Sequence, residues 1–299
     1  WSACTDTWNE HYEAVAGGMA DQPSLWETIS SDPSLRNLTK VIESIDAKDL
    51  LDSPQQFTVW APKSLTEAQA DSIIEVYKAD KNVGLKWADN KAVTQFLQNH
   101  MALYARPVSE HTEDTVAMRN NKYMFMKGAN STSGTLAGNA FGDMALCNNG
   151  ILYKTNDVLQ FFPNVREYTE LHPNMSKLTA FLKHWDEYEL DIAASTPGGI
   201  VDGKTVYLDS VVTRYNDFLS SYGYIQREDS VYTFLAPTDE VWDREYEKYS
   251  KYFNYNKGVS DAIRDSLTDV HTAICILNGR FFNTSKNWRY NLSQEDSLC

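Results

Sequence analysis

Acidic side chains gather in one short run of the chain, at Asp186, Glu187, Glu189 and Asp191. Carboxylates this close together can hold a calcium ion, which takes oxygen ligands. The run lacks the regular spacing of a calcium loop, so we interpret it as the solvated face of a helix. No two acids stand out as a pair for glycoside hydrolysis. The sequence therefore predicts neither a metal site nor a cofactor.

Two histidines, His100 and His271, each follow an apolar stretch typical of a helix end and precede an expected strand. A histidine at such a junction usually hydrogen-bonds the backbone or a neighbouring polar group. A catalytic or metal-binding role is the alternative. We predict the structural role for both residues, and no catalytic residue.

Aromatic residues recur near the C-terminal end at helical spacing, at Trp242, Tyr246, Tyr249 and Phe253, with Tyr252 and Tyr255 to the side. Such a stripe can stack on sugars or anchor a protein partner. A stripe at this spacing also packs into a core, and the core is the favoured interpretation. Trp242, Tyr246, Tyr249, Tyr252 and Tyr255 are the candidate ligand contacts.

The four cysteines show no paired spacing, so neither a zinc site nor a disulfide framework is predicted. Cys147 and Cys275 fit buried, small apolar positions. Cys4 follows Ser2-Ala3, which resembles the end of a bacterial lipoprotein signal, although Trp1 departs from the usual residue. We therefore expect a lipid anchor at Cys4 and a place on the outer membrane surface of the cell envelope. An ordinary N-terminal cysteine is the alternative.

Length and charge restrict the classes of function. The chain has 299 residues, which fits two domains, and a formal net charge of −14. So negative a surface repels phosphate backbones, which excludes nucleic acid as a partner. No apolar run is long enough to span a bilayer, so contact with a membrane is expected only through the lipid anchor. No phosphate-binding glycine loop or G-x-S-x-G elbow is present.

The elements that position these residues are organised around two strand–Ala-Pro–helix motifs. Residues 57–65 read F-T-V-W-A-P-K-S-L, and residues 232–242 read Y-T-F-L-A-P-T-D-E-V-W. Proline ends each strand because it lacks an amide donor. After the first motif, Ser64 and Glu67 form an expected capping box. After the second, Thr238 or Asp239 is expected to cap a helix.

A second repeat precedes these motifs. The stretch that begins at Pro33 matches the stretch that begins at Pro173, a separation of 140 residues, whereas the Ala-Pro motifs are 175 apart. The second copy therefore contains about 35 extra residues, a size typical of a functional surface insertion. We place this insertion at about 192–229, with a hairpin turn at Asp202-Gly203.

At this point the motifs resemble the fasciclin-like domain, an extracellular adhesion module. T-F-L-A-P-T-D-E-V-W looks like its first signature, residues 96–104 look like its middle signature, and residues 148–159 look like its closing signature. The family usually has a histidine in the closing strand, where this chain has Tyr153 or its neighbours. The residues matched to the signatures are Thr58, Ala61, Pro62, His100, Asn149, Gly150, Asp157, Thr233, Ala236, Pro237, Thr238 and His271.

The resemblance implies an α+β fold, a β-sandwich or wedge with packed helices, in two tandem copies. We expect a tether at 1–21, a first domain at 22–164 and a second at 165–299. The second copy lacks a counterpart of the closing signature. Either the natural protein extends beyond Cys299, or its distal strands are lost or supplied by a partner.

The family implies a non-enzymatic adhesion module that binds an extracellular protein or polysaccharide. A second hypothesis is a glycan-binding accessory lipoprotein in nutrient capture, with the insertion or the tyrosine-rich helix as the sugar platform. A periplasmic envelope scaffold is a further alternative. A hydrolase has little support, because no nucleophile–base pair is visible. The oligomeric state is not specified by any of these features.

Overall fold

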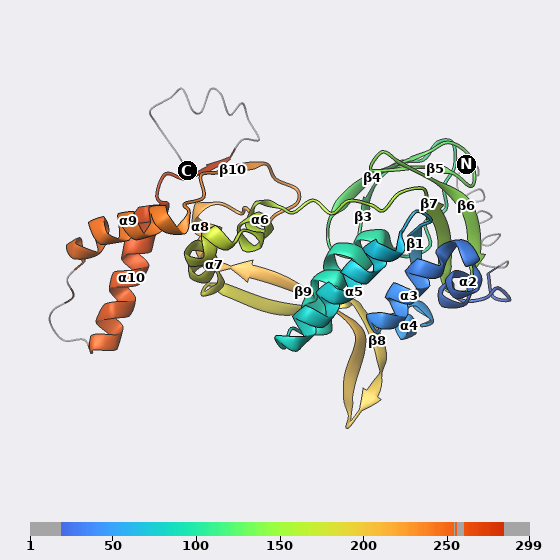
Figure 1. Ribbon diagram of the computed structural model, residues 1–299, viewed down its shortest axis with the longest axis horizontal. Helices are drawn as coiled ribbons and strands as arrows, with labels where there is room; N and C mark the ends of the chain where they lie inside the picture. The colour runs from blue at the N-terminus through green and yellow to red at the C-terminus, as the bar shows by residue number, and fades with distance from the viewer. Residues whose placement is uncertain (1–18, 254, 256–259, 284–299) are drawn as a thin grey trace, which may run out of the picture. The chain divides into compact units, whose positions relative to one another are not determined.

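The computed structural model describes residues 19–253, 255 and 260–283 (Figure 1). Residue contacts group the chain into two compact units. Unit 1 runs to Phe161 and also contains Leu190–Val211, and unit 2 comprises Phe162–Glu189 and the residues from Val212 onward. The described chain is a mixed α+β protein. That the halves are two copies of one domain stays a prediction.

Unit 1 combines short helices with one large sheet. The helical elements are α2 (Leu25–Ser31), η1 (Pro33–Leu35), α3 (Arg36–Ser44), α4 (Lys48–Leu51), α5 (Glu67–Asn82), η2 (Trp87–Asp89), the π-helix η3 (Ala92–Leu97) and η4 (Gln98–His100). The strands are β1 (Phe57–Pro62), β2 (Met101–Leu103), β3 (Glu113–Ala117), β4 (Tyr123–Gly128), β5 (Gly134–Leu136), β6 (Asn139–Cys147) and β7 (Gly150–Thr155).

The sheet of unit 1 is nearly closed. Its seven strands follow the order β2-β1-β7-β6-β5-β4-β3, with β1 and β7 parallel and the other neighbours antiparallel. An isolated bridge between Ala102 and Met118 links β2 to the residue after β3. The two outer strands of the order therefore meet at one point.

Strand β1 separates two apolar cores, which explains why its six residues are all buried. Phe57 and Val59 pack with the helices, whereas Trp60 faces the other core. There Trp60 stacks on Tyr153, with ring centroids 6.1 Å apart, and meets the edge of Phe141. A strand that is covered on both faces is expected to be buried along its whole length and to be mainly apolar.

The predicted capping residue after the first Ala-Pro motif is wrong. Helix α5 begins at Glu67, so its N-cap is Thr66 and not Ser64. The amide of Gln69 donates to the Thr66 hydroxyl (3.2 Å), and the Thr66 amide donates to the Gln69 side chain (2.9 Å). The motif is a true capping box displaced by two residues. The prediction for Thr238 is confirmed, because its side chain caps α9.

Unit 2 is mainly helical, and the residues of a long hairpin are divided between the units, with Leu190–Val211 in unit 1 and its two ends in unit 2. The helices are α6 (Val165–Leu171), η5 (Pro173–Met175), α7 (Ser176–Lys183), α8 (Asp217–Tyr222), α9 (Asp239–Tyr249), η6 (Ser250–Tyr252) and α10 (Asp261–Leu277). The strands are β8 (Asp186–Val201) and β9 (Lys204–Asn216), which form the hairpin, and β10 (Tyr232–Phe234) and β11 (Phe281–Asn283), which pair with each other.

The opening elements of the two halves repeat. Helices α2, η1 and α3 begin at residues 25, 33 and 36, and α6, η5 and α7 begin at 165, 173 and 176. Both runs open with a capping box, Ser24 with Glu27 and Asn164 with Glu167. The described part of unit 2 has no counterpart of the seven-stranded sheet, so the repeat covers only part of each half.

Two predictions about secondary structure are wrong. His271 lies inside α10, not at the junction of a helix and a strand. The acidic run is not a helix face, since Asp186 to Asp191 belong to strand β8.

Cys275, expected to be buried, is only partly buried on α10. None of the helices in the described part of the chain has the length and apolar content needed to cross a bilayer.

Candidate functional site

The hairpin β8–β9 follows α7, whereas in the first half α3 is followed by the short helix α4 and strand β1. Asp202 and Gly203 form its two-residue turn with φ of 51° and 75°. Two successive positive φ values define the turn type that matches the twist of paired strands, which explains the Asp-Gly sequence. The predicted hairpin turn is therefore confirmed.

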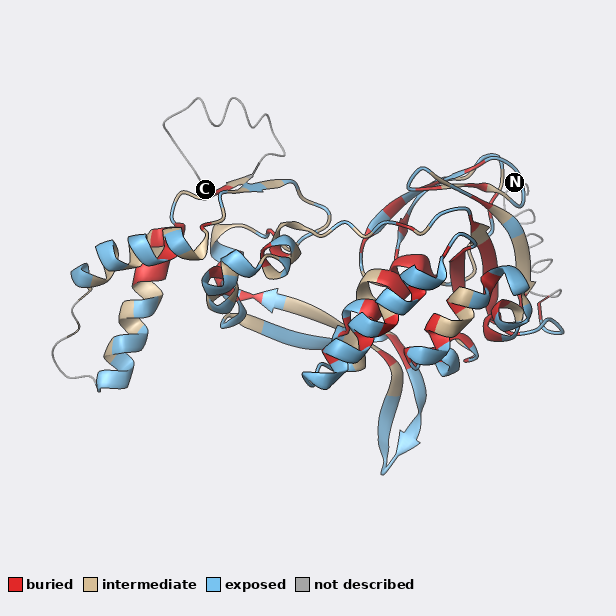
Figure 2. Cartoon of the chain, in the orientation of Figure 1, coloured by how far each residue is buried: buried red, intermediate tan, exposed pale blue. Residues whose placement is uncertain are grey.

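The end of the hairpin next to this turn exposes apolar side chains. Ile200 and Val201 are 77% and 59% exposed, and Val206 on the other strand is also exposed. Figure 2 shows this end of the hairpin in the colour of exposed residues. Among the described strands, β8 and β9 pair only with each other, so each has an outer edge without a strand partner. Exposed β-branched residues on such strands are typical of a protein-binding surface.

The middle of the hairpin is held by a buried ion pair within unit 1. Asp209, fully buried, lies 2.7 Å from the guanidinium of Arg119, which is also buried. The Gln98 side chain donates a further hydrogen bond to Asp209 at 3.3 Å. Burial raises the pKa of Asp209, and Arg119 and Gln98 oppose this shift. The pair therefore fixes the hairpin only while both charges are present.

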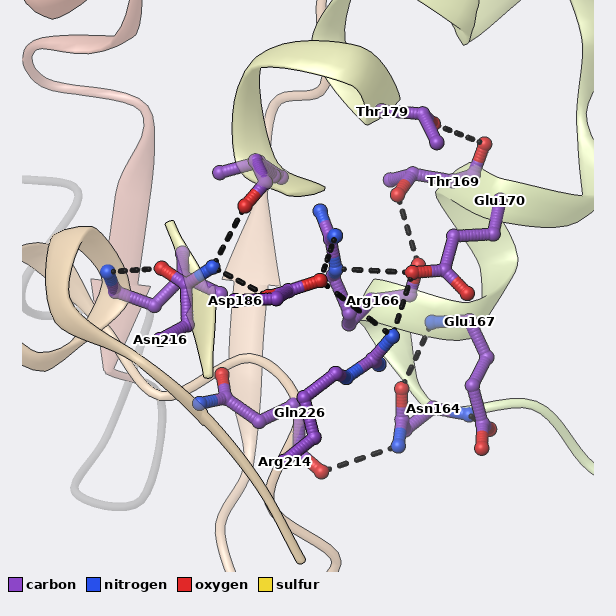
Figure 3. Close-up of polar contacts among 12 residues, drawn as sticks. Asn164, Arg166, Glu167, Thr169, Glu170, Thr179, Asp186, Arg214, Asn216 and Gln226 are labelled. Atoms are coloured by element: carbon purple, nitrogen blue, oxygen red, sulfur yellow. Dashed lines mark hydrogen bonds and ion pairs between the residues drawn. The ribbon is translucent and has the colours of Figure 1, made fainter. Parts of the chain in front are cut away.

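The base of the hairpin carries a second buried ionic cluster, inside unit 2 (Figure 3). Arg166 of α6 lies 3.2 Å from Asp186 and 3.1 Å from Glu170. Arg214 of β9 lies 2.8 Å from Glu170, and the Asn216 side chain donates to Asp186 at 2.6 Å. Burial lowers the pKa of Arg166, and Glu170 and Asp186 counter this effect, so the guanidinium keeps its proton. The cluster ties both strands of the hairpin to α6.

Three consecutive buried residues, Gln98, Asn99 and His100, form a polar cluster in unit 1. The Asn99 amide donates to the carbonyl of Leu159 at 2.9 Å, and the Leu159 amide donates to Nε2 of His100 at 2.8 Å. Nε2 must accept, so Nδ1 carries the proton and donates to the carbonyl of Phe96 at 2.8 Å. The backbone hydrogen bonds predicted for His100 are present, and Asn99 and His100 together hold both polar groups of Leu159.

A groove with a cavity volume of about 360 Å³ lies beside this cluster, between α5, η3 and residues 158–161. We call it the α5–η3 groove. Its walls are mainly apolar and its remaining lining is polar. The apolar side chains include Leu65, Ile73, Val76, Phe96, Val158 and Phe161, and the polar ones are Gln69, Ser72, Lys91, Gln95 and Gln160. A groove of this size and lining is suited to a small apolar ligand or side chain.

We expect His100 to make unit 1 less stable in acid. Burial lowers its pKa to about 4, against an ordinary value of 6.5, and its hydrogen bond to Phe96 opposes the shift. As the pH falls from 6.5 to about 4, the unfolded chain takes a proton that the folded chain does not, so the free energy of unfolding falls. The expected loss is roughly 3 kcal/mol. Hydrogen exchange of the β1 and β7 amides between pH 7 and pH 4.5 measures it.

The matched variant is His100→Gln, which keeps a polar side chain but cannot titrate. Carboxylates lose stability in acid in both proteins, so the difference between the two pH profiles isolates His100. Equal slopes between pH 6.5 and 4.5 would contradict the prediction.

Other signature residues hold backbone segments of unit 1 together. The buried side chain of Asn149 accepts from the Leu25 amide and donates to the carbonyls of Leu51 and Ser53, all at 2.7–2.8 Å. Gly150 has φ of 150°, and a Cβ there would lie 1.9 Å from the carbonyl oxygen of Phe57. These residues therefore have visible structural roles.

The remaining signature residues lie in or beside the two strand–Ala-Pro–helix elements. In unit 1 the Thr58 hydroxyl donates to the Tyr104 carbonyl and accepts from the Arg106 amide, both at 2.8 Å. Ala61 is buried beside Pro62 at the end of β1, and Asp157 is exposed after β7. In unit 2 Thr233 lies in β10, and Ala236-Pro237 precede α9.

The tyrosine-rich helix is packed against a core over most of its length. Trp242 is buried in the core of unit 2, and Tyr246 and Tyr249 pack against that core. The Tyr246 hydroxyl donates to Asp269, which raises the pKa of Tyr246 to about 12. Tyr252 is exposed. The stripe therefore offers a ligand little free aromatic surface.

Tyr255 is held by the second signature histidine. Its hydroxyl lies 2.8 Å from Nδ1 of His271, and the same nitrogen lies 2.8 Å from the carbonyl of Leu267.

Cys4, the expected lipid anchor, and Cys299 lie outside the described residues. Among the residues that the structure describes, no group of three or more His, Cys, Asp or Glu could hold a metal ion.

Sequence reasoning missed the residues that anchor the hairpin. Arg166 stands 140 positions after Trp26, so a buried tryptophan of the first half is replaced by a buried arginine in the second. A charged residue that stands 140 positions after a tryptophan is the signal that could have revealed the cluster. Arg119 and Asp209 are far apart in the sequence and carry no comparable signal.

Comparisons with known proteins give little further support. No protein-family model and no curated protein matches the chain. A matching solved structure is a FAS1 domain pair from the insect cell adhesion molecule fasciclin I, with 15% identity and a TM-score of 0.27. The match covers 85% of this chain and 74% of that chain. A TM-score this low carries no argument, so the case for function rests on the motifs and the geometry.

Proposed function

We propose that this chain is a non-enzymatic adhesion module of the fasciclin-like kind, in which the hairpin β8–β9 binds an extended segment of an extracellular protein. The observation that supports this most directly is the exposed apolar end of the hairpin at Ile200, Val201 and Val206. Main-chain pairing along a free strand edge supplies affinity, and alternating side chains supply specificity. The buried ion pair at Asp209 fixes the neighbouring part of the hairpin before a partner arrives.

A triple substitution tests this role. Ile200→Ser, Val201→Thr and Val206→Thr together remove apolar surface from the exposed hairpin end while preserving its turn. We expect saturable binding of the wild-type chain to at least one protein in an immobilised panel of collagen, fibronectin and laminin, and at least about tenfold weaker binding of the triple variant. Surface plasmon resonance measures both.

The matched control is Val83→Thr, which changes an equally exposed β-branched residue at the end of α5. Its binding should equal that of the wild-type chain. No protein binding on the panel, or equal binding by the triple variant, would refute the assignment to the hairpin.

The second candidate function is glycan capture, and one observation favours it. Tyr123 and Phe125 occupy alternate positions of β4 and are 55% and 53% exposed. Their partners across the strand pair are the small residues Ala117 and Thr115, which leave the rings uncovered. Saturable binding on a glycan array, lost in Tyr123→Ala with Phe125→Ala and retained in the hairpin variant, would support this function instead.

The wider setting belongs to the same proposal. The lipid anchor at Cys4 and the place in the cell envelope stay predictions, as does the absence of catalysis. An exposed interaction surface fits both the adhesion module and the periplasmic envelope scaffold.

A further inference from the structure

The lining of the α5–η3 groove contains an ammonium and no carboxylate, although the chain as a whole is acidic. The protein has 41 acidic and 27 basic residues. Among the described residues that line the groove, Lys91 is the one ionisable side chain, and the other polar residues are glutamine and serine. An acidic protein that keeps carboxylates out of one apolar groove and places an ammonium there offers a site for an anion with an apolar body.

Lys91 is available for such an anion. Its side chain is about half exposed, and its Nζ lies 3.8 Å from the carboxylate of Asp80. Asp80 is nearly buried and already accepts a hydrogen bond from the Lys91 backbone amide at 2.8 Å. An ammonium has three donors, so an ion pair of this length leaves donors for a second acceptor.

The groove is also formed before any ligand binds. Its wall at Leu159 is fixed by two hydrogen bonds: the Asn99 side chain donates to the Leu159 carbonyl, and the Leu159 amide donates to His100. Its lining also includes Phe96 of the π-helix η3, a form of helix that occurs often at functional sites. Because the walls of the groove are already ordered, ligand binding does not lose the conformational entropy of ordering them.

We propose that the α5–η3 groove binds a linear carboxylate with an aliphatic tail. The tail lies along Ile73, Val76 and Phe96, and the carboxylate contacts Lys91, with the glutamines of the lining as further donors. This site is independent of the hairpin, so its test does not depend on the adhesion role.

Equilibrium dialysis of labelled decanoate against the full chain, with neutral decan-1-ol as a competitor of the same tail, tests the proposal. We expect one saturable site that prefers decanoate over decan-1-ol. Lys91→Ala should weaken decanoate binding about threefold and leave decan-1-ol binding unchanged. Val76→Glu, which adds a carboxylate to the apolar wall, should weaken decanoate binding at least about tenfold.

Lys86→Ala is the matched control, because Lys86 is an exposed lysine close by in the sequence that does not line the groove. Its affinity for decanoate should equal that of the wild-type chain. Circular dichroism confirms that each variant keeps its helices; Val76 is itself partly exposed, so its replacement is compatible with folding. Absence of a saturable site, an equal affinity for the acid and the alcohol, or decanoate binding unchanged in Val76→Glu would each overturn the proposal.

Discussion

Replacing Arg166 by methionine is expected to lower the free energy of unfolding of unit 2 by about 3–5 kcal/mol, the usual result of removing one partner of a buried ion pair. The guanidinium is almost fully buried, and so is the carboxylate of Asp186, which lies 3.2 Å away. Without Arg166, the nearest cation is Arg214, at 3.9 Å from Asp186. Calorimetry with hydrogen exchange of the α6 and α7 amides measures the loss and assigns it to unit 2.

Two further variants define this result. Arg166→Met combined with Asp186→Leu should recover much of the loss, because an apolar pair of similar volume avoids a buried unpaired charge. Arg227→Met, which breaks an exposed pair with Asp229, should have no measurable effect. A single Arg166 variant as stable as the wild-type chain would show that the cluster does not support the base of the hairpin.

Replacing Asn149 by alanine is expected to destabilise unit 1 by about 4 kcal/mol. The substitution leaves the Leu25 amide and the carbonyls of Leu51 and Ser53 without their partner in a buried place. Each unsatisfied buried group costs about 1–3 kcal/mol. Exchange of the β1 and β7 amides should accelerate, whereas exchange in α6 and α7 should not.

The neighbouring Asn148 provides the control. Its side chain is exposed, so Asn148→Ala should change the stability of unit 1 little. If the two alanine variants unfolded at the same denaturant concentration, the hydrogen bonds of Asn149 would not be what holds α2 and β7 to the loop after α4.

Local chemistry made part of the fold predictable. The Ala-Pro motifs end β1 and precede α9 as expected, since proline removes a donor and the next polar residue can cap a helix. The separation of 140 residues correctly aligned η1 and α3 with η5 and α7. The Asp202-Gly203 turn was also predictable, because few residue pairs accept two positive φ values.

The two wrong predictions of secondary structure, for His271 and for the acidic run, disagree with the periodicity of the surrounding residues. Leu267, Val270 and Ile274 recur at helical spacing through His271, which indicated that α10 continues. In β8, Tyr188, Leu190 and Ile192 alternate with acidic residues, the two-residue period of a strand. In both cases the period of the surrounding residues, and not the single residue type, matches the structure.

The polar contacts of the candidate site were beyond sequence reasoning. Gln98, Arg119 and Asp209 come together only because the sheet, η4 and the hairpin place them so. Their types gave no warning, since each is usually exposed. The α5–η3 groove likewise depends on the packing of three separate segments.

The order in which the chain supplies unit 1 has a consequence for its synthesis. The chain leaves unit 1 at Phe161, builds α6 and α7, and then returns with Leu190–Val211. During translation, Gln98 and Arg119 are synthesised before Asp209. Their contacts with Asp209 therefore form only after α6 and α7 of unit 2 have left the ribosome. Domains generally fold as units, the N-terminal one first during synthesis. The two halves must therefore be inherited together. A gene cut at residue 161 would leave the buried guanidinium of Arg119 without the carboxylate of Asp209.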